Sequence, residues 1–180
     1  SEDPYANTIY GALVRGKALC EGYAKSFSYL CNKAGIENII VTGETDTAHM
    51  WNMVKIDGNW YHVDVTWDKP DGMIAEMYPD MVMYQYFLVT DSVIENNHTV
   101  WTITSPPPKA YGTKENYFIK EGLYVESEET TEQTIDNALR KAISEGSHTA
   151  SIKFGTSNML HSTIRKMTDS ASSGGDYLKV

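Results

Sequence analysis

Three side chains that together perform nucleophilic chemistry occur at separate points in the first half of the chain: Cys20, His49 and Asp64. A thiolate attacks a carbonyl carbon, an imidazole moves the proton, and a carboxylate orients the imidazole. Acyl transfer through a thioester needs these three parts. We therefore treat Cys20 as a candidate nucleophile, His49 as a candidate general base and acid, and Asp64 as its candidate orienting group. We expect no cofactor.

The segment around Cys20 predicts an amphipathic helix over about residues 18–34, because apolar residues recur there every three or four positions. Gly35 is a typical stop signal. Cys20 then falls in the first turn, where free N–H groups and the helix dipole favour a negatively charged thiolate. Glu21 opposes this effect, although water screens an exposed carboxylate. Gly22 costs the helix roughly 1 kcal/mol relative to Ala, which suggests close approach by a substrate or another strand.

The second cysteine, Cys31, lies on the same predicted helix. Eleven residues separate it from Cys20, so the two lie about 16 Å apart along the helix axis. That distance is too long for a disulfide bond. We interpret Cys31 as a small buried hydrophobic residue.

The histidine and the carboxylate lie on a predicted β-hairpin. A short β-branched strand over residues 39–41 precedes it, and runs 49–56 and 60–67 flank Asp57-Gly58-Asn59, a strong hairpin signal. With Asp57-Gly58 as the loop, Ile56 faces Asn59, and Asp64 lies opposite Trp51 and diagonal to His49. Both candidate side chains then share one face, because side chains alternate along a strand.

The two faces of this hairpin differ in composition. One is a predicted core face, with Met50, Asn52, Val54, Ile56, Tyr61, Val63, Val65 and Trp67. The other is polar and aromatic, and we expect it to form the wall of a site, with His49, Trp51, Met53, Lys55, Trp60, His62, Asp64 and Thr66. On that wall Trp51, Trp60 and His62 are candidate substrate-binding residues, and His62 is an alternative to His49 as the base.

The whole-chain composition limits the possible partners. The chain has 180 residues, and 24 acidic against 15 basic side chains give a net charge of -9. Such an acidic chain is not suited to neutralising phosphates, so we expect no nucleic-acid partner. No apolar run approaches the roughly 20 residues that a membrane span needs.

The run Pro106-Pro107-Pro108 marks a predicted boundary, because prolines are incompatible with helices. We expect a catalytic core over residues 1–105, a connector over 106–112 and a small accessory region over 113–180. Within the core we also expect a strand at 84–89. The accessory region predicts a strand or hairpin at 116–125, a helix at 131–144, a strand at 148–154 and a helix at 159–167. This gives a β-α-β-α appendage.

Four segments resemble the transglutaminase-like core of bacterial proteins: residues 16–24, 34–36, 48–52 and 61–68. The likeness runs from about Tyr10 to Trp101, and His98 falls where the family has another histidine, for which we expect a structural role. The resemblance implies an α+β, papain-like fold, in which the cysteine-bearing helix packs on an antiparallel sheet. Carried over by position, it assigns nucleophile, base and orienting carboxylate to Cys20, His49 and Asp64.

This sequence departs from the family pattern in two ways. The eukaryotic cross-linking enzymes have an upstream tryptophan that helps hold the oxyanion, whereas no tryptophan precedes Trp51 here. The backbone N–H of Cys20 supplies one oxyanion donor. Such cores usually begin with helices before the Tyr10-Gly11 segment, so we expect further residues to precede Ser1.

The leading hypothesis is cysteine-dependent acyl transfer at amide bonds, with hydrolysis of a peptide or protein substrate favoured over cross-linking. The resemblance implies a location outside or on the surface of a bacterial cell. The alternative is a non-catalytic module that binds peptide or glycan through exposed aromatic residues. A metal site of Cys20, His49, His62 and Asp64 is disfavoured, because the spacing lacks the short paired pattern of zinc motifs. Residues 68–72 predict a turn rather than a calcium site.

Overall fold

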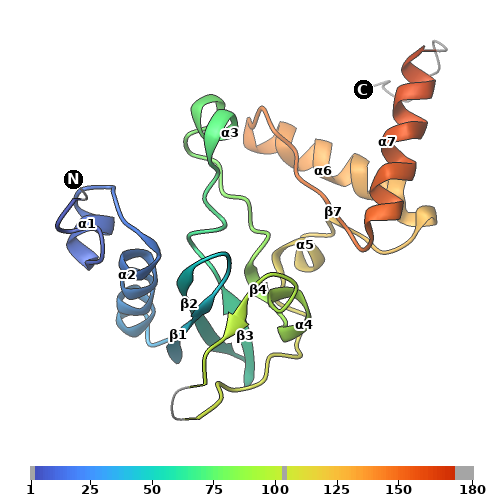
Figure 1. Ribbon diagram of the computed structural model, residues 1–180. Helices are drawn as coiled ribbons and strands as arrows, with labels where there is room; N and C mark the ends of the chain where they lie inside the picture. The colour runs from blue at the N-terminus through green and yellow to red at the C-terminus, as the bar shows by residue number, and fades with distance from the viewer. Residues whose placement is uncertain (1–2, 103–104, 173–180) are drawn as a thin grey trace. The chain divides into compact units, whose positions relative to one another are not determined.

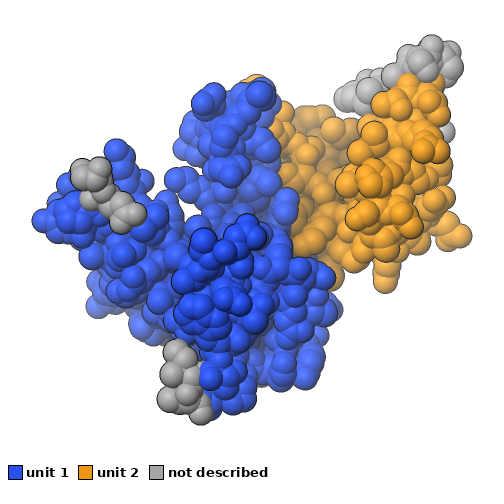
Figure 2. All heavy atoms as spheres, viewed as in Figure 1, with its two compact units in different colours: residues 1–117 blue, residues 118–180 orange. Residues whose placement is uncertain are grey.

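The computed structural model describes residues 3–102 and 105–172, in two compact units. The first unit ends at Tyr117 and the second begins at Phe118 (Figure 2). The proline run lies inside the first unit, and Ala110, just after it, is fully buried in that unit's core. The candidate residues Cys20, His49 and Asp64 all belong to the first unit.

The first unit is built on a five-stranded antiparallel sheet in the order β4-β3-β2-β1-β5 (Figure 1). Its strands are β1 (Asn38–Glu44), β2 (Ala48–Ile56), β3 (Asn59–Val63), β4 (Phe87–Val89) and β5 (Thr99–Val100). Its helices are α1 (Ile9–Leu13), α2 (Cys20–Lys33), α3 (Gly72–Met77) and α4 (Asp91–Ile94). The expected class, a cysteine-bearing helix with an antiparallel sheet, is confirmed.

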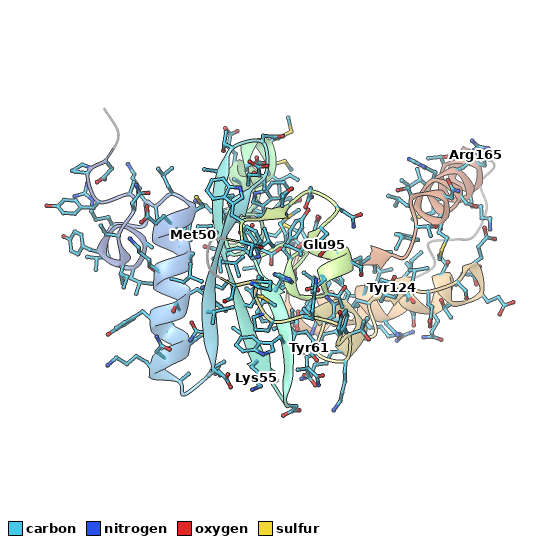
Figure 3. All side chains as sticks on the ribbon, turned by 60° about the horizontal axis from the view of Figure 1, so that its bottom comes forward. Met50, Lys55, Tyr61, Glu95, Tyr124 and Arg165 are labelled. Carbon is cyan, nitrogen blue, oxygen red and sulfur yellow. The ribbon has the colours of Figure 1, made fainter. Side chains whose placement is uncertain are left out.

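Helix α2 packs against β1 and β2 through its apolar stripe. Cys31 and Phe27 from this stripe meet Val54 and Tyr61 of the hairpin. Met50 lies on the same side of the sheet, toward α2 (Figure 3). The helix ends as predicted, because Gly35 has a φ of 71° and other residues rarely adopt that conformation.

The hairpin of β2 and β3 has the predicted register. Ile56 pairs with Asn59, and Asp57 and Gly58 form the loop with positive φ angles of 50° and 81°. Two positive φ angles are typical of a type I′ turn, whose twist matches that of the strands. Strand β3 ends at Val63, however, so the expected strand over residues 60–67 is too long.

Both faces of the sheet are buried, which differs from the expectation of an open polar wall. The face of Trp51 and Met53 forms a second core cluster with Val41, Val89 and Ile94. Ile94 belongs to α4, and Ala110 joins the same cluster from beyond the prolines. The sequence pattern did not predict this cover, because it is supplied by segments more than thirty residues away along the chain.

The second unit has the predicted β-α-β-α order, preceded by a short helix. Its elements are α5 (Tyr117–Lys120, which begins one residue before the unit boundary), β6 (Tyr124–Val125), a 3₁₀ turn at Glu128–Thr130, α6 (Thr131–Glu145), β7 (Lys153–Phe154) and α7 (Ser157–Ser172). β6 and β7 pair in parallel. Within the expected strand or hairpin over 116–125, only Tyr124–Val125 is strand and Tyr117–Lys120 is helix α5, and the expected strand over 148–154 shortens to two residues. Among the described residues, no helix combines the length and the apolar character of a membrane span.

Candidate active site

Cys20 is the first residue of α2, and its side chain is partly exposed. The residue before it, Leu19, has an extended backbone and provides no side-chain cap. The first N–H groups of a helix have no intrahelical acceptor, so the start of α2 presents backbone donors beside the thiol. These donors can stabilise negative charge on sulfur or on an oxyanion.

Gly22 allows the preceding chain to cross the first turn of α2. A Cβ atom at this position would lie 2.3 Å from the carbonyl oxygen of Ala6 and 3.2 Å from that of Thr8. The N–H of Leu19 donates to the same Ala6 carbonyl at 2.9 Å. The close approach expected at Gly22 therefore comes from the chain's own N-terminal segment, which fixes the position of the cysteine.

The charge of Glu21, next to the thiol, is compensated within α2. Nζ of Lys25, one turn further along, lies 2.6 Å from Oε1 of Glu21 and also donates to the carbonyl of Asn7 at 3.3 Å. The pair is partly exposed, so its contribution to stability is small. Its effect on the site is electrostatic, because it offsets the negative charge nearest to Cys20.

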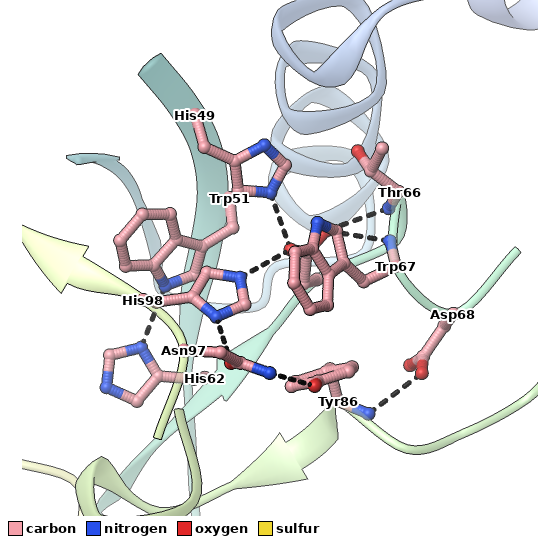
Figure 4. A network of polar contacts seen from close by, with 10 residues as sticks. His49, Trp51, His62, Thr66, Trp67, Asp68, Tyr86, Asn97 and His98 are labelled. Atoms are coloured by element: carbon pink, nitrogen blue, oxygen red, sulfur yellow. Dashed lines mark hydrogen bonds and ion pairs between the residues drawn. The ribbon is translucent and has the colours of Figure 1, made fainter. Parts of the chain in front are cut away.

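His49 and Asp64 form a direct buried pair. Nε2 of His49 lies 2.6 Å from Oδ2 of Asp64 (Figure 4). An ionised carboxylate only accepts hydrogen bonds, so Nε2 carries the proton and donates it. In a neutral imidazole this leaves Nδ1 unprotonated and able to accept a proton from a thiol. The predicted register thus places these two side chains in contact.

Asp64 has a second structural role, because its other oxygen ends strand β3. Oδ1 accepts the backbone N–H groups of Thr66 and Trp67 at 2.9 Å and 3.1 Å. This turn, in which an aspartate binds the backbone two and three residues on, replaces the expected continuation of the strand. The carboxylate is fully buried. Burial raises the pKa of Asp64, but hydrogen bonds from His49, His98 and the backbone lower it by a larger amount. The pKa of Asp64 therefore lies below its usual value.

A third side chain, His98, completes this buried group. Its Nε2 lies 3.0 Å from Oδ2 of Asp64, and its Nδ1 lies 2.7 Å from Oδ1 of Asn97. Asn97 in turn donates from Nδ2 to the hydroxyl of Tyr86 at 2.6 Å (Figure 4). Sequence reasoning assigned His98 a structural role. The only signal for its contact with Asp64 was its position in the family pattern.

The histidines and the carboxylate do not have the spacing of a metal centre. Single atoms of His49, Asp64 and His98 lie within 4.8 Å of one another, the one such group among residues 3–102 and 105–172. A tetrahedral ion with ligands at about 2.0–2.1 Å separates them by about 3.3 Å. The two contacts with Asp64, at 2.6 and 3.0 Å, are instead hydrogen-bond distances. Cys20 and His62, which the disfavoured metal hypothesis included, are not in this group.

Of the three candidate substrate-binding residues, two are buried and one is half-buried. Trp51 and His62 are each 1% exposed and bond to each other, with Nε1 of Trp51 donating to Nδ1 of His62 at 3.0 Å. Nε2 of His62 then lies 3.0 Å from Oδ1 of Asp91. Trp60 is half-buried against the same core cluster. His62 therefore has a carboxylate partner of its own and contacts neither His49 nor Asp64 by a hydrogen bond within the described residues.

The two cysteines of α2 lie in contrasting environments. Cys31 is buried among apolar side chains, and this burial raises the pKa of its thiol. Cys20 is partly exposed at the helix start. A cysteine at a helix start and a buried histidine–carboxylate pair are the residue types that cysteine-dependent acyl transfer uses.

Comparison with known proteins gives the same class. Residues 1–65 match the family model of the Transglutaminase-like superfamily, so the N-terminal third of the chain is similar to that family. The relationship supports cysteine-dependent acyl transfer in general. A solved structure described as the crystal structure of a TGase has a TM-score of 0.34 and 20% identity, covering 41% of this chain and 21% of that chain.

Two curated relatives carry the name kyphoscoliosis peptidase. The human protein is 26% identical over 128 residues and the mouse protein 25% identical over 130 residues. Each match covers 60% of this chain and 19% of the relative. The chain thus spans about a fifth of the length of these relatives.

Proposed function

We propose that the first unit hydrolyses amide or peptide bonds through a thioester on Cys20, with His49 as base and acid and Asp64 as its orienting carboxylate. The observation that carries this proposal is the 2.6 Å contact between His49 and Asp64, which leaves Nδ1 of His49 available to a thiol. The uncapped start of α2 supports it from the side of the nucleophile. The name peptidase of the two relatives favours hydrolysis over cross-linking.

The reaction follows from the roles of these groups. The Cys20 thiolate attacks the carbonyl carbon, and the backbone N–H of Cys20 donates to the oxyanion. The C–N bond then breaks, and protonated His49 gives its proton to the departing amine, which leaves a thioester on sulfur. Water attacks the thioester carbon while His49 takes up the proton of the water. The C–S bond then breaks, so the acid leaves and the Cys20 thiolate and protonated His49 are restored. Asp64 keeps the imidazole in one tautomer throughout.

The first test is alkylation of the thiols by iodoacetamide across pH, with mass spectrometry to assign the site. We expect Cys20 to react well below pH 8.5, near which an ordinary thiol titrates, and His49→Ala to remove this low-pH reactivity. Cys31 is the internal control, because its burial makes it slow. Labelling of Cys20 that titrates near pH 8.5 and ignores His49→Ala would contradict the mechanism.

A second experiment separates hydrolysis from cross-linking. A mixture of unstructured peptides is incubated with the protein, with and without a fluorescent primary amine. The proposal expects new peptide ends or released ammonia and no amine incorporation, and expects Cys20→Ala to abolish the reaction. Incorporation of the amine would instead indicate transamidation. An inert thiol with peptide binding that survives Cys20→Ala would favour the non-catalytic binding module. The bacterial cell surface as location stays a prediction.

A further inference from the structure

His98 lies at the centre of a ring of aromatic side chains. It follows α4, and its backbone N–H donates to the carbonyl of Ile94 at 3.0 Å. Its side chain is fully buried. The centroid of its ring is 4.8–5.5 Å from four other rings, those of Trp67, Trp51, His49 and Tyr86. This packing leaves the imidazole little freedom to change its orientation.

Both imidazoles converge on a single oxygen of the carboxylate. Oδ2 of Asp64 lies 2.6 Å from Nε2 of His49 and 3.0 Å from Nε2 of His98. Because an ionised carboxylate is an acceptor only, each of these nitrogens carries a proton. His98 therefore donates to the same atom that orients His49.

The hydrogen bond from His98 weakens the electrostatic effect of the Asp64 carboxylate on His49. A hydrogen bond to a charged group is about twice as strong as a neutral one, and in a buried site water does little to weaken it. Each N–H group that donates to Oδ2 offsets part of its negative charge. The part of the Asp64 charge that His98 offsets is not available to stabilise the positive charge that His49 carries when it is protonated.

We propose that His98 is a positioning residue, which holds Asp64 by a second hydrogen bond and so limits how strongly this carboxylate stabilises protonated His49. This inference rests on the proposed function, because it concerns the residue there assigned as base and acid. In that role His98 offsets part of the negative charge of Asp64, so that His49 releases its proton to the leaving amine more readily. Asn97 and Tyr86 extend the hydrogen-bonded chain away from Asp64 and fix the far side of the His98 ring.

Other ionisable groups near His98 belong to a separate network. His62 lies beyond Trp51 and pairs with Asp91, whose Oδ2 is 3.0 Å from Nζ of Lys109. The groups that face His98 directly are Asp64, His49 and the hydroxyl-bearing ring of Tyr86. A change at His98 therefore acts on His49 chiefly through Asp64.

The test compares two substitutions of His98 by the pH dependence of Cys20 alkylation. His98→Leu removes the donor, and more strongly stabilised protonated His49 favours the Cys20 thiolate. We therefore expect the rise of alkylation with pH to move downward by about one pH unit, which corresponds to part of a charge-assisted hydrogen bond. His98→Gln places an amide N–H near the position of Nε2 but carries no positive charge, and we expect it to reverse part of this shift. Asn97→Ala, a change at an exposed residue, frees the far side of the ring and gives a smaller downward shift.

Val89→Ala is the matched control, because it removes buried volume from the same sheet without touching a polar atom of the site. It lowers the melting temperature but leaves the pH profile in place. A His98→Leu profile that coincides with that of Val89→Ala, or that moves upward, overturns the inference. If His98→Leu fails to fold, a pH profile of Asn97→Ala that equals the wild-type profile overturns the inference.

A second measurement keeps this inference separate from the proposed function. The titration of the His49 ring protons by NMR, in wild type and His98→Leu, does not depend on a reactive thiol. An upward shift of the His49 midpoint supports the inference even if Cys20 proves inert, in which case only the proposed function fails. Equal midpoints in the two proteins overturn the inference even if Cys20 is fully reactive.

Discussion

Nε2 of His49 and Oδ2 of Asp64 lie 2.6 Å apart, although these residues come from different parts of the hairpin. His49 is near the start of β2, and Asp64 is the first residue after β3. The register of the two strands brings them together, and the turn that Asp64 forms with Thr66 and Trp67 fixes the carboxylate. One aspartate thus ends a strand and orients an imidazole.

Asp64→Asn tests this double role. The amide keeps the shape of the side chain, and its oxygen can still accept the backbone N–H groups, which places Nδ2 toward His49. His49 then has to accept at Nε2 and carry its proton on Nδ1, the wrong tautomer for a base. A charge-assisted hydrogen bond contributes about 1.5–3 kcal/mol, so we expect Cys20 alkylation at pH 7 to slow by roughly ten- to a hundredfold.

The control for Asp64→Asn is Asp57→Asn in the hairpin loop. Asp57 is exposed and has a φ of 50°, which asparagine tolerates well. The alkylation rate of this variant stays at the wild-type value. Equal rates for both variants would show that the Asp64 carboxylate has no influence on the thiol.

Gly22→Ala tests how the start of α2 is positioned. The added Cβ would meet the Ala6 carbonyl oxygen at 2.3 Å, so one of the two segments has to move. Overpacking of this kind costs about 1–3 kcal/mol, which outweighs the better helix propensity of alanine. We expect a lower melting temperature and severalfold slower alkylation of Cys20.

Gly35→Ala is a suitable comparison at the other end of the same helix. No atom lies within 4 Å of its added Cβ, but its φ is 71°. The left-handed backbone costs about 1–2 kcal/mol, so the melting temperature falls in this variant also. Its alkylation rate is unchanged. If both variants slow alkylation equally, the effect reflects global stability and not the position of Cys20.

Local sequence patterns sufficed for the elements that carry the site. The apolar spacing after Gly16 predicted α2 to within two residues at its start and one at its end, and Asp57-Gly58 predicted the hairpin register. Both are local signals, in which neighbouring residues determine the backbone. The contact of His49 with Asp64 followed, because register is fixed once the loop is known.

The cover of the sheet could not be predicted in the same way. The alternation of Trp51, Met53 and His62 with apolar residues resembled an open polar face, yet α4 and the segment after the prolines bury it. On this face Nε1 of Trp51 donates to His62, and His62 in turn pairs with Asp91, which is 29 residues away. Contacts at such separation leave no periodic trace in a single sequence, and His98 joined Asp64 unpredicted for the same reason.

Trp51→Phe distinguishes a structural role from substrate binding. Trp51 is buried and donates to Nδ1 of His62, so its loss leaves a buried acceptor without a partner, at a cost of about 1–3 kcal/mol. We expect a lower melting temperature, with KM for a peptide substrate changed by less than about twofold. Trp60→Phe, at a half-buried position, lowers the melting temperature less. A large rise in KM for Trp51→Phe at unchanged stability would restore Trp51 as a substrate contact.

The last prediction concerns stability and pH, and it depends on His62. Burial lowers the pKa of His62 below its usual value, although its hydrogen bond with Asp91 acts in the opposite direction. In the unfolded chain this imidazole takes up a proton as the pH falls past about 6.5, whereas in the folded chain it resists protonation to a lower pH. The stabilising contribution is therefore complete above about pH 6.5 and is lost as the pH falls toward the folded-state pKa.

Urea unfolding at pH 7.5, 6.5 and 5.5 measures this loss. All four tryptophans belong to the first unit, so tryptophan fluorescence reports the unfolding of that unit alone. We expect the free energy of unfolding to decrease below about pH 6.5 in the wild type, and to decrease less steeply in His62→Gln, whose amide does not titrate. His161→Gln, at an exposed position in the second unit, serves as the control and keeps the wild-type slope. Equal slopes for wild type and His62→Gln would mean that another group causes the acid sensitivity.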